Sequence, residues 1–560
     1  MRLSAVSLAS LRGLLPTSWT SLSALCIALV LALPVIVIFT HVFSGSFSLW
    51  AHLWQTVLAD YVSSSLLLML GVTVGVLLCG VPTAWLTSVY RFPGSRWLGW
   101  ALLLPLAFPA YIIAYTYTGL LDAAGPVQEG LRNLMGWEYG DYWFFTIRSL
   151  PGAMVMLSLV LYPYVYLLSR TAFLEQSASI LEAGRILGHQ RRSVIWRLVL
   201  PMARPAIIAG LTLALMETLA DFGTVQYFGV STFTTGIFRT FYGYGDTAAA
   251  AQLASVLLCF VVVLVYFERY SRRNASYHTA SSKPTQPQLL KGYKAGLATL
   301  ACLLPFVLGF LIPAAVLIYW SVFESIIDEG FGQLAWNSFY LAFIAAVIAL
   351  CFSLLLAYAK RYSRKPIVKA SVSLSGMGYA LPGTIIAIGV IIPFAWLDHQ
   401  LIALAKQWLG MDMGLLLSGT LVALLFAYTV RFLAVSLGAI DSGLQKIKPN
   451  LDHAARLLGR KPLQILRDIH VPLMRRSVLT ALLIVFVDVL KELPATLILR
   501  PFDFNTLAVR AYELASDERL IDAAPASLLI VLVGLIPVVL LSRSIAVTPM
   551  AKKSSQASRG

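Results

Sequence analysis

The chain has 560 residues, of which 59% are hydrophobic and 12% are charged, and its mean hydropathy is +0.79. Soluble globular chains carry about 25% charged residues, so this composition excludes a soluble enzyme, a disordered protein and a nucleic-acid-binding protein. The 42 lysines and arginines outnumber the 26 aspartates and glutamates, and they stand in short clusters between apolar runs, as expected of loops that face a cytoplasm. All five cysteines lie inside apolar runs without a partner at ligand spacing, so neither a disulfide framework nor a zinc site is predicted.

Twelve apolar runs are long enough to cross a membrane as helices, which takes about 20 residues each. They are centred near residues 32, 75, 110, 160, 212, 257, 307, 348, 382, 425, 482 and 532. The first run is too long for the core of a signal peptide, so we expect it to be a retained helix. The sequence therefore predicts an all-α polytopic membrane protein with about twelve transmembrane helices.

The loops between these runs fall into a basic set and an acidic set. The basic set includes both ends of the chain and a stretch rich in Ser, Gln, Lys and Pro at residues 269–294. Because basic loops stay on the cytoplasmic side of a membrane, we expect both termini and this central linker to be cytoplasmic.

The two halves of the chain repeat each other. The block FPAYIIAY, from Phe108, matches LPGTIIAI, from Leu381, and Glu182–Gly188 matches His453–Gly459 at an offset of 271 residues. Since each half holds an even number of spans, the halves are parallel copies, and a pathway between them is the default hypothesis. The predicted organisation is a first repeat of six helices at 1–268, a linker at 269–294, a second repeat of six helices at 295–545 and a cytoplasmic tail at 546–560.

The most specific motif is a loop that occurs once in each half, at residues 182–201 and 453–472. Each copy reads as a short amphipathic helix, a glycine turn, a second amphipathic helix and a proline before the next span. Small residues permit close approach of a partner, glycine adopts turns that a β-carbon hinders, and proline lacks the N–H of a continuous helix. The residues that carry the pattern are Glu182, Ala183, Gly184, Gly188 and Pro201 in the first copy and His453, Ala454, Ala455, Gly459 and Pro472 in the second. An ordinary interfacial helix would explain one copy, but two copies at fixed spacing favour a docking element.

These loops resemble the EAA loop of type I ABC importer permeases, although the second copy has His453 where the family has Glu. The resemblance implies coupling helices that dock on two copies of a cytoplasmic ABC ATPase, which hydrolyse ATP. The chain itself has no GxxxxGK[ST] loop and so no evident nucleotide site. We therefore expect a transport subunit that binds no cofactor and catalyses no reaction of its own.

Two longer segments, Glu217–Asp246 and Lys491–Leu520, resemble the fused ferric-iron permeases of the FbpB/SfuB type. The resemblance implies a multi-pass protein of the bacterial inner membrane that receives Fe(III) from a periplasmic ferric-iron-binding protein and moves it by alternating access. Relatives with the same layout carry thiamine, phosphonate, sulfate or polyamine, and these substrates stay open as alternatives.

Four carboxylates lie in the fifth and eleventh runs, where charge is costly. Glu217 and Asp221 are four residues apart and so share a helix face, and the offset of 271 places Asp488 and Glu492 in the same positions of the second half. They could line the translocation path or its outer gate, because carboxylates suit a hard cation. They could equally pair with Lys491, Arg239 or Arg510, or contact the binding protein, and no metal-ligand set is assigned.

Two further features of the spans remain open. Tyrosines in the third and fourth runs could offer phenolic oxygen to a ferric ion, but interfacial anchoring or helix packing explains such residues more often. They are Tyr111, Tyr115, Tyr117, Tyr162, Tyr164 and Tyr166. Pro109 and Pro382, at equivalent positions, are expected to kink their helices.

Two other classes of protein share parts of this pattern. A secondary transporter of the major-facilitator type also has twelve spans in two parallel halves, but it needs no duplicated docking loop. A membrane enzyme would need a catalytic constellation, and the seven histidines show no HExxH or paired metal spacing. The importer permease is therefore the favoured reading.

Overall fold

The computed structural model describes residues 19–41, 47–186, 191–273, 287–326, 329–363 and 365–547. Within these ranges the chain consists of helices with one pair of two-residue strands, β1 (Tyr90–Arg91) and β2 (Gln288–Leu289), which run parallel. The prediction of an all-α polytopic chain is confirmed.

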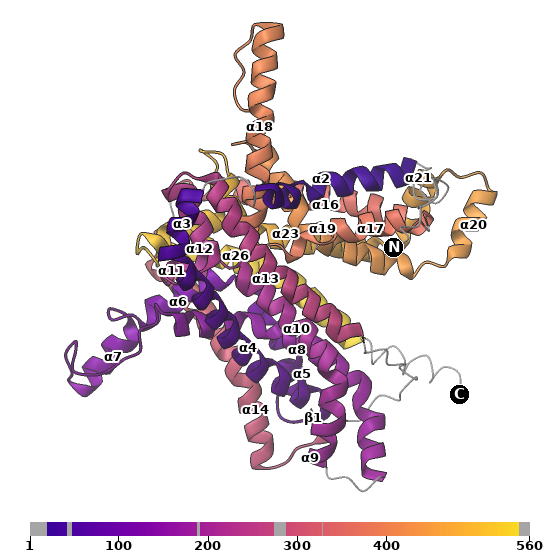
Figure 1. Ribbon diagram of the computed structural model, residues 1–560. Helices are drawn as coiled ribbons and strands as arrows, with labels where there is room; N and C mark the ends of the chain where they lie inside the picture. The colour runs from indigo at the N-terminus through magenta and orange to yellow at the C-terminus, as the bar shows by residue number, and fades with distance from the viewer. Residues whose placement is uncertain are drawn as a thin grey trace, which may run out of the picture. The chain divides into compact units, whose positions relative to one another are not determined.

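The helices before the linker carry the labels of Figure 1. They are α2 (Trp19–His41), α3 (Phe47–Thr56), α4 (Leu58–Val89), α5 (Ser95–Ala101), η1 (Leu104–Ala107), α6 (Ala110–Leu121), α7 (Pro126–Met135), α8 (Leu150–Ile186), α9 (Arg191–Val194), η2 (Ile195–Val199), α10 (Leu200–Ala220), α11 (Gly223–Tyr227), α12 (Phe233–Phe238), η3 (Arg239–Gly243) and α13 (Thr247–Arg273).

The helices after the linker follow the same order as those before it. They are α14 (Tyr293–Phe306), η4 (Val307–Leu311), α15 (Ile312–Tyr319), η5 (Trp320–Glu324), α16 (Phe331–Tyr362), α17 (Pro366–Ser375), η6 (Gly378–Ala380), α18 (Gly383–Leu409), α19 (Leu421–Gln445), α20 (Pro449–Leu457), α21 (Pro462–Ile465), η7 (Leu466–His470), α22 (Val471–Leu473), α23 (Arg475–Leu490), α24 (Pro494–Leu499), α25 (Leu507–Ser516) and α26 (Ala524–Val547).

Every predicted apolar run holds helix, but three differ from one straight helix of spanning length. Among the described residues, nine helices are long and apolar enough to cross a membrane, and a pair at Ser95–Ala107 and Ala110–Met135, bent by 93°, would make ten. The eleventh run forms α23, which has only 16 residues. The apolar part of the last run is Ala524–Leu540.

The prolines expected to kink the third and ninth runs instead mark complete helix breaks. Pro109 precedes α6 and Pro382 precedes α18, and each has extended backbone dihedrals, with ψ near 141° and 142°. A short 3-10 turn, η1 or η6, comes just before each proline. The two repeats therefore share the same interruption, because a proline cannot donate the backbone hydrogen bond of a continuous helix.

The chain divides into two compact units, which we describe separately. The larger unit comprises Phe47–Tyr244, Val256–Phe331 and Leu507–Gly560. In it α4, α8 and α10 pack against one another, α14 lies on α4, and α26 lies on η1 and α25 (Figure 1). A β-carbon at Gly210 on α10 would lie 2.7 Å from the Cα atom of Val165 on α8. Only glycine permits this close helix approach.

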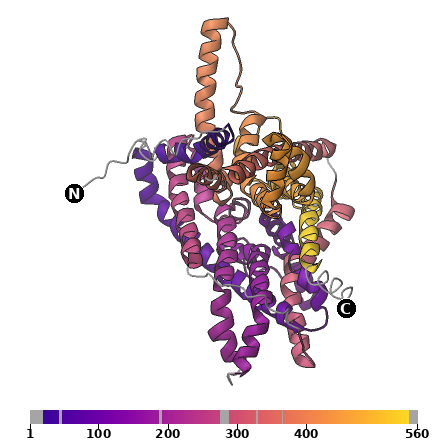
Figure 2. The same ribbon diagram turned by 90° about the vertical axis from the view of Figure 1, so that its right-hand side faces the viewer.

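The smaller unit comprises Met1–Ser46, Gly245–Ser255 and Gly332–Thr506. Here α19 packs on α23, and α2 runs along α17 and α18. A β-carbon at Gly389 on α18 would lie 2.5 Å from the carbonyl oxygen of Pro34, so α2 and α18 meet backbone to backbone. Beyond this contact α18 continues as a long projecting helix (Figures 1 and 2).

Each unit combines most of one sequence repeat with helices of the other. α2, from the first repeat, packs on helices of the second, whereas α14, α15 and α26 pack on helices of the first. Hydropathy identifies spans one at a time, so it carries no information about this exchange. The repeat boundaries drawn from the sequence stay a prediction about sequence similarity.

Candidate functional site

The second of the two repeated loops is built from short helices around one glycine turn. α20 ends at Leu457, and Gly459 follows with φ of +76°, in the left-handed region that favours glycine. α21, η7 and α22 then lead to α23. Among the predicted residues, His453, Ala454, Gly459 and Pro472 are exposed, and Ala455 is buried.

A buried carboxylate fastens this loop to the helix that precedes it in space, α16. The Nε atom of Arg361 donates to Asp452 over 2.6 Å, and the Nε2 atom of His470 lies 2.7 Å from the other oxygen of the same carboxylate. Arg361 also donates to the backbone carbonyls of Leu444 and Ile447, over 2.7 and 3.0 Å. These groups form what we call the Asp452 clamp, which joins α16, the end of α19, α20 and η7.

The clamp keeps Asp452 ionised. Burial alone would raise the pKa of this carboxyl, but the hydrogen bonds and charges of Arg361 and His470 hold the pKa below its ordinary value. Tyr358 strengthens the attachment, because its hydroxyl donates to the carbonyl of Pro462. The base of the loop is thus held rigidly on the membrane helices.

The tip of the loop is apolar and exposed. Leu457 is 90% exposed, Leu458 is 83% exposed and Leu463 is 73% exposed. Three leucines around one turn are an unusual solvent-facing surface, since exposed apolar patches commonly mark protein interaction sites. The structure therefore gives the second loop a rigid base and an apolar tip.

The first loop shows the same backbone device where it is described. Glu182, Ala183 and Gly184 lie in α8, which continues to Ile186; their side chains and all of Gly188 lie outside the described residues. η2 and η7 are π-helical turns at positions 271 residues apart. Each comes just before a proline, Pro201 or Pro472, which opens the following helix. Such wide turns recur at functional sites.

The predicted carboxylates of the second repeat lie at the far end of α23 from the loop, and both have basic partners. The Nζ atom of Lys491 lies 2.8 Å from Asp488. The Nη1 atom of Arg431 donates to Glu492 over 3.3 Å, and both side chains are more than nine-tenths buried. The same Glu492 oxygen accepts from the backbone N–H of Ala495, so Glu492 also caps α24.

The equivalent carboxylates of the first repeat have a different environment. Asp221 accepts from the hydroxyl of Thr224 over 3.0 Å and from the N–H of Val225 over 3.1 Å, so it caps α11 as Glu492 caps α24. Glu217 interacts electrostatically with Asp221. Among the described residues, no lysine, arginine or histidine forms an ion pair with either carboxylate.

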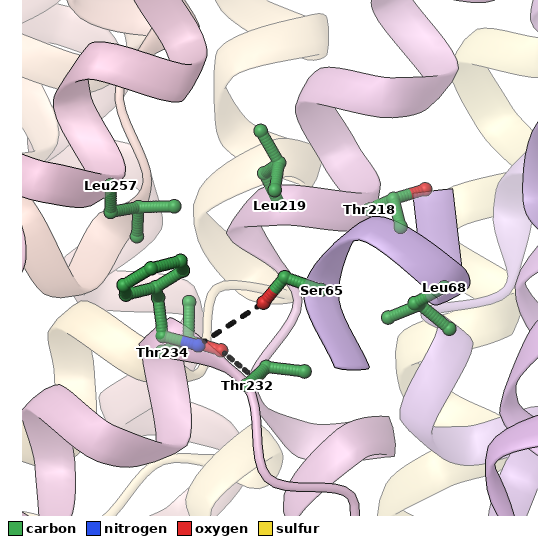
Figure 3. Close-up of a pocket in the computed structure, with 8 residues that line it drawn as sticks. Ser65, Leu68, Thr218, Leu219, Thr232, Thr234 and Leu257 are labelled. Atoms are coloured by element: carbon green, nitrogen blue, oxygen red, sulfur yellow. Dashed lines mark hydrogen bonds between the residues drawn. The ribbon is translucent and has the colours of Figure 1, made fainter. Parts of the chain in front are cut away.

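A small cavity lies behind Asp221 in the larger unit (Figure 3). Thr234, on its wall, donates to the backbone carbonyl of Asp221 over 2.8 Å, and the backbone N–H of Phe233 donates to Ser65 over 3.4 Å. The cavity has room for about one water molecule, so it holds no organic substrate. Its other lining residues are Leu68, Thr218, Leu219, Thr232 and Leu257.

The tyrosines of the third and fourth runs are interior residues of the larger unit. Tyr111, Tyr115, Tyr117, Tyr162 and Tyr166 are buried, and Tyr164 is partly buried. Tyr117 and Tyr166 donate to backbone carbonyls, those of Leu308 and Gly99. Packing, rather than anchoring at the membrane interface, accounts for these two. In the part of the chain that the structure describes, no group of three His, Cys, Asp or Glu side chains could hold a metal ion.

Sequence reasoning missed several residues of these sites. Arg431 is the one cation inside the apolar stretch Leu421–Leu437, and a lone charge in a span signals a buried partner. Arg361, Asp452 and His470 gave no such signal, because charged residues are common in loops. Their pairing depends on how α16 and α20 pack.

Comparison with known proteins decides the family. The family model described as "Binding-protein-dependent transport system inner membrane component" matches residues 5–275 and 349–547, which is most of the chain and includes both loops. The chain belongs to this family. It is accordingly a multi-pass inner-membrane permease of a binding-protein-dependent ABC transport system, and the facilitator and membrane-enzyme alternatives are set aside.

Individual relatives of this permease carry different substrates in their names. The chain is 25% identical to the Fe(3+)-transport system permease protein FbpB 2 of Haemophilus influenzae, over 94% of this chain and 98% of the relative. It is 24% identical to the ferric transport system permease protein FbpB of Actinobacillus pleuropneumoniae, over 71% of this chain and 58% of the relative. It is 26% identical to the molybdenum transport system permease protein ModB of Escherichia coli, over 40% of this chain and 96% of the relative.

Proposed function

We propose that this permease carries ferric iron into the cytoplasm, receiving it from a periplasmic ferric-iron-binding protein. The observation that carries the proposal is the similarity to an Fe(3+)-transport permease of Haemophilus influenzae, which extends along 94% of this chain and 98% of that protein. Similarity to the molybdenum permease covers only 40% of this chain, and similarity to a putative 2-aminoethylphosphonate permease covers 38%. Ferric relatives thus account for both repeats together.

The energy for transport comes from partners, in this proposal. Two copies of a cytoplasmic ATPase dock on the two loops at 182–201 and 453–472, with termini and linker on the same side of the membrane. The exposed tip of Leu457, Leu458 and Leu463 suits insertion into a cleft of such a partner. The rigid Asp452 clamp suits transmission of its motion to α16 and α23. This chain hydrolyses no ATP and binds no cofactor.

The turn at Gly459 gives a direct test of this coupling role. We expect cells that lack the chain to recover uptake of radiolabelled ferric iron with the wild type. Gly459→Val should abolish the recovery, because a β-branched residue resists a positive φ. Gly459→Asn is the matched control, since asparagine tolerates this conformation, and it should retain most uptake at equal membrane abundance.

Each outcome has a separate meaning. If the wild type restores molybdate or 2-aminoethylphosphonate uptake but no ferric uptake, the iron assignment is wrong. If Gly459→Val transports as well as Gly459→Asn, the coupling role of this turn is wrong.

A further inference from the structure

A hydroxyl group in the larger unit is buried without a hydrogen-bond partner. Tyr115, on α6, is 3% exposed, and its oxygen has no partner among the described residues. The side-chain oxygen of Gln226, on the adjoining helix α11, is in the same condition. Such a group costs about 1–3 kcal/mol when left unsatisfied, and buried polar atoms are normally satisfied by protein, water or an ion.

Oxygen atoms surround this hydroxyl. The ring of Tyr115 lies 5.7 Å from that of Tyr111 and 4.6 Å from that of Tyr227, centre to centre. Its hydroxyl interacts electrostatically with Tyr111, Tyr227, Tyr512 and Asp221. We call these five residues the oxygen cluster: Tyr111, Tyr115, Asp221, Tyr227 and Tyr512.

The second repeat lacks this cluster and fills the equivalent place with its own cations. Arg431 pairs with Glu492, and the offset of 271 puts Val160 at the position of Arg431. Lys491 pairs with Asp488, and Ala220 stands at the position of Lys491. At the positions of the first-repeat tyrosines the second repeat has Thr384, Ile388 and Ile498. Only the first repeat therefore combines unpaired carboxylates with phenols.

The nearest described cation is already neutralised. The guanidinium of Arg148 lies 5.0 Å from the centre of the Tyr227 ring, but it forms ion pairs with Glu518 at 2.7 Å and with Asp122 at 3.4 Å. Tyr227 has the hydroxyl of Thr118 beside its own. The cluster keeps a surplus of oxygen acceptors and of negative charge.

We infer that the oxygen cluster is a transient binding site for a hard trivalent cation, located in the first repeat alone. The inference rests on the proposed function, because it makes this cation the ferric ion in transit. Carboxylate oxygens are preferred by hard cations, and tyrosine is an established ligand of ferric iron. Each phenol that coordinates the ion releases its proton to solvent, because ligands bind metals in deprotonated form. Two carboxylates and neutral phenols bind weakly enough to release the ion again, as transport requires.

Terbium luminescence tests the site without transport. Tb³⁺ is a hard trivalent ion, and nearby tyrosines sensitise its emission. The full chain in lipid nanodiscs should give saturable sensitised emission with Tb³⁺, accompanied by proton release. Tyr115→Phe and Asp221→Asn should each weaken binding by at least about tenfold. Tyr162→Phe is the matched control, since that hydroxyl is also buried without a partner but lies outside the cluster, and it should bind as the wild type does.

Transport separates this inference from the proposed function. With ferric iron as the cargo, Tyr115→Phe with Asp221→Asn should reduce ferric uptake at least about tenfold at equal membrane abundance, and Tyr162→Phe should not. If the wild type imports iron and the cluster variant imports it equally fast, the inference is wrong while the proposed function stands. If the wild type imports no iron, the proposed function fails, and the terbium result alone decides whether the site exists. Terbium binding that is unchanged in both cluster variants, or lost equally in Tyr162→Phe, overturns the site.

Discussion

The two repeats treat the same acidic position in opposite ways. Glu492 and Asp221 stand 271 residues apart, each directly after a long helix, and each caps the short helix that follows. Glu492 also pairs with a buried arginine, Arg431, whereas the described residues offer Asp221 only hydroxyl and backbone partners.

The same difference extends to the other acids. In the second repeat Asp488 has Lys491, and Asp452 has Arg361 and His470. In the first repeat the position of Asp452 is Leu181 and that of His470 is Val199. The capping geometry is therefore common to both copies, and charge neutralisation belongs to one of them. Duplicated backbone roles survive in both repeats, while the freed acid of the first repeat is available for a ligand.

The largest expected effect breaks the buried pair of the second repeat. Glu492→Gln leaves Arg431 charged and buried without its partner, which costs about 3–5 kcal/mol. Asp221→Asn keeps its capping acceptor and should cost less than about 1 kcal/mol. Thermal unfolding of both purified variants would measure the contrast. The double variant Arg431→Met with Glu492→Gln should regain much of the lost stability; equal losses in Glu492→Gln and Asp221→Asn would contradict the comparison.

A smaller effect is expected at the Asp452 clamp, and it depends on pH. Asp452→Asn should cost about 1.5–3 kcal/mol at neutral pH, because hydrogen bonds to a charged group are lost. The folded pKa of Asp452 lies below the ordinary value near 3.8, so its stabilisation is present above about pH 5 and fades as pH falls below about 4. The gap between wild type and variant should therefore close in acid. Asp468→Asn, an exposed ion-pair residue of the same loop, is the control and should change little; a gap that is constant with pH would argue against an ionised Asp452.

The smallest effect is expected for an exposed pair. Arg148 and Glu518 form an ion pair at 2.7 Å, but the Glu518 side chain is 61% exposed. Glu518→Gln should lower stability by no more than about 1 kcal/mol. The difference should vanish in about 1 M salt, where screening acts within about 3 Å. Salt should leave the loss in Glu492→Gln unchanged, and a salt-sensitive Glu492 would mean that the buried pair is reached by solvent.

Hydropathy and repeat alignment predicted the helical class, the positions of the spans and the two loops, because these depend on local composition. The left-handed Gly459 and the π-helical turns before Pro201 and Pro472 follow from local backbone chemistry. The sequence also offered Lys491 as a partner for the acids, and the structure places it on Asp488.

What the sequence could not supply depends on packing between distant segments. Arg431 lies 61 residues from Glu492, and Arg361 lies 91 residues from Asp452. The prolines at 109 and 382 were expected to bend helices, yet whether a proline bends or breaks a helix depends on what satisfies the freed carbonyls. Tyr227 and Tyr512 come near Tyr115 only once α11 and α25 have packed against α6.

The position of α2 has a consequence for biosynthesis. This helix leaves the ribosome first, yet its packing partners α17 and α18 begin at Pro366, 325 residues after His41. At about 5–20 residues per second, translation takes on the order of 15–65 s to reach them. During that interval the first helix sits in the bilayer without its native neighbours. The nascent chain therefore depends on lipid or the insertion machinery to shield α2 until the second repeat emerges.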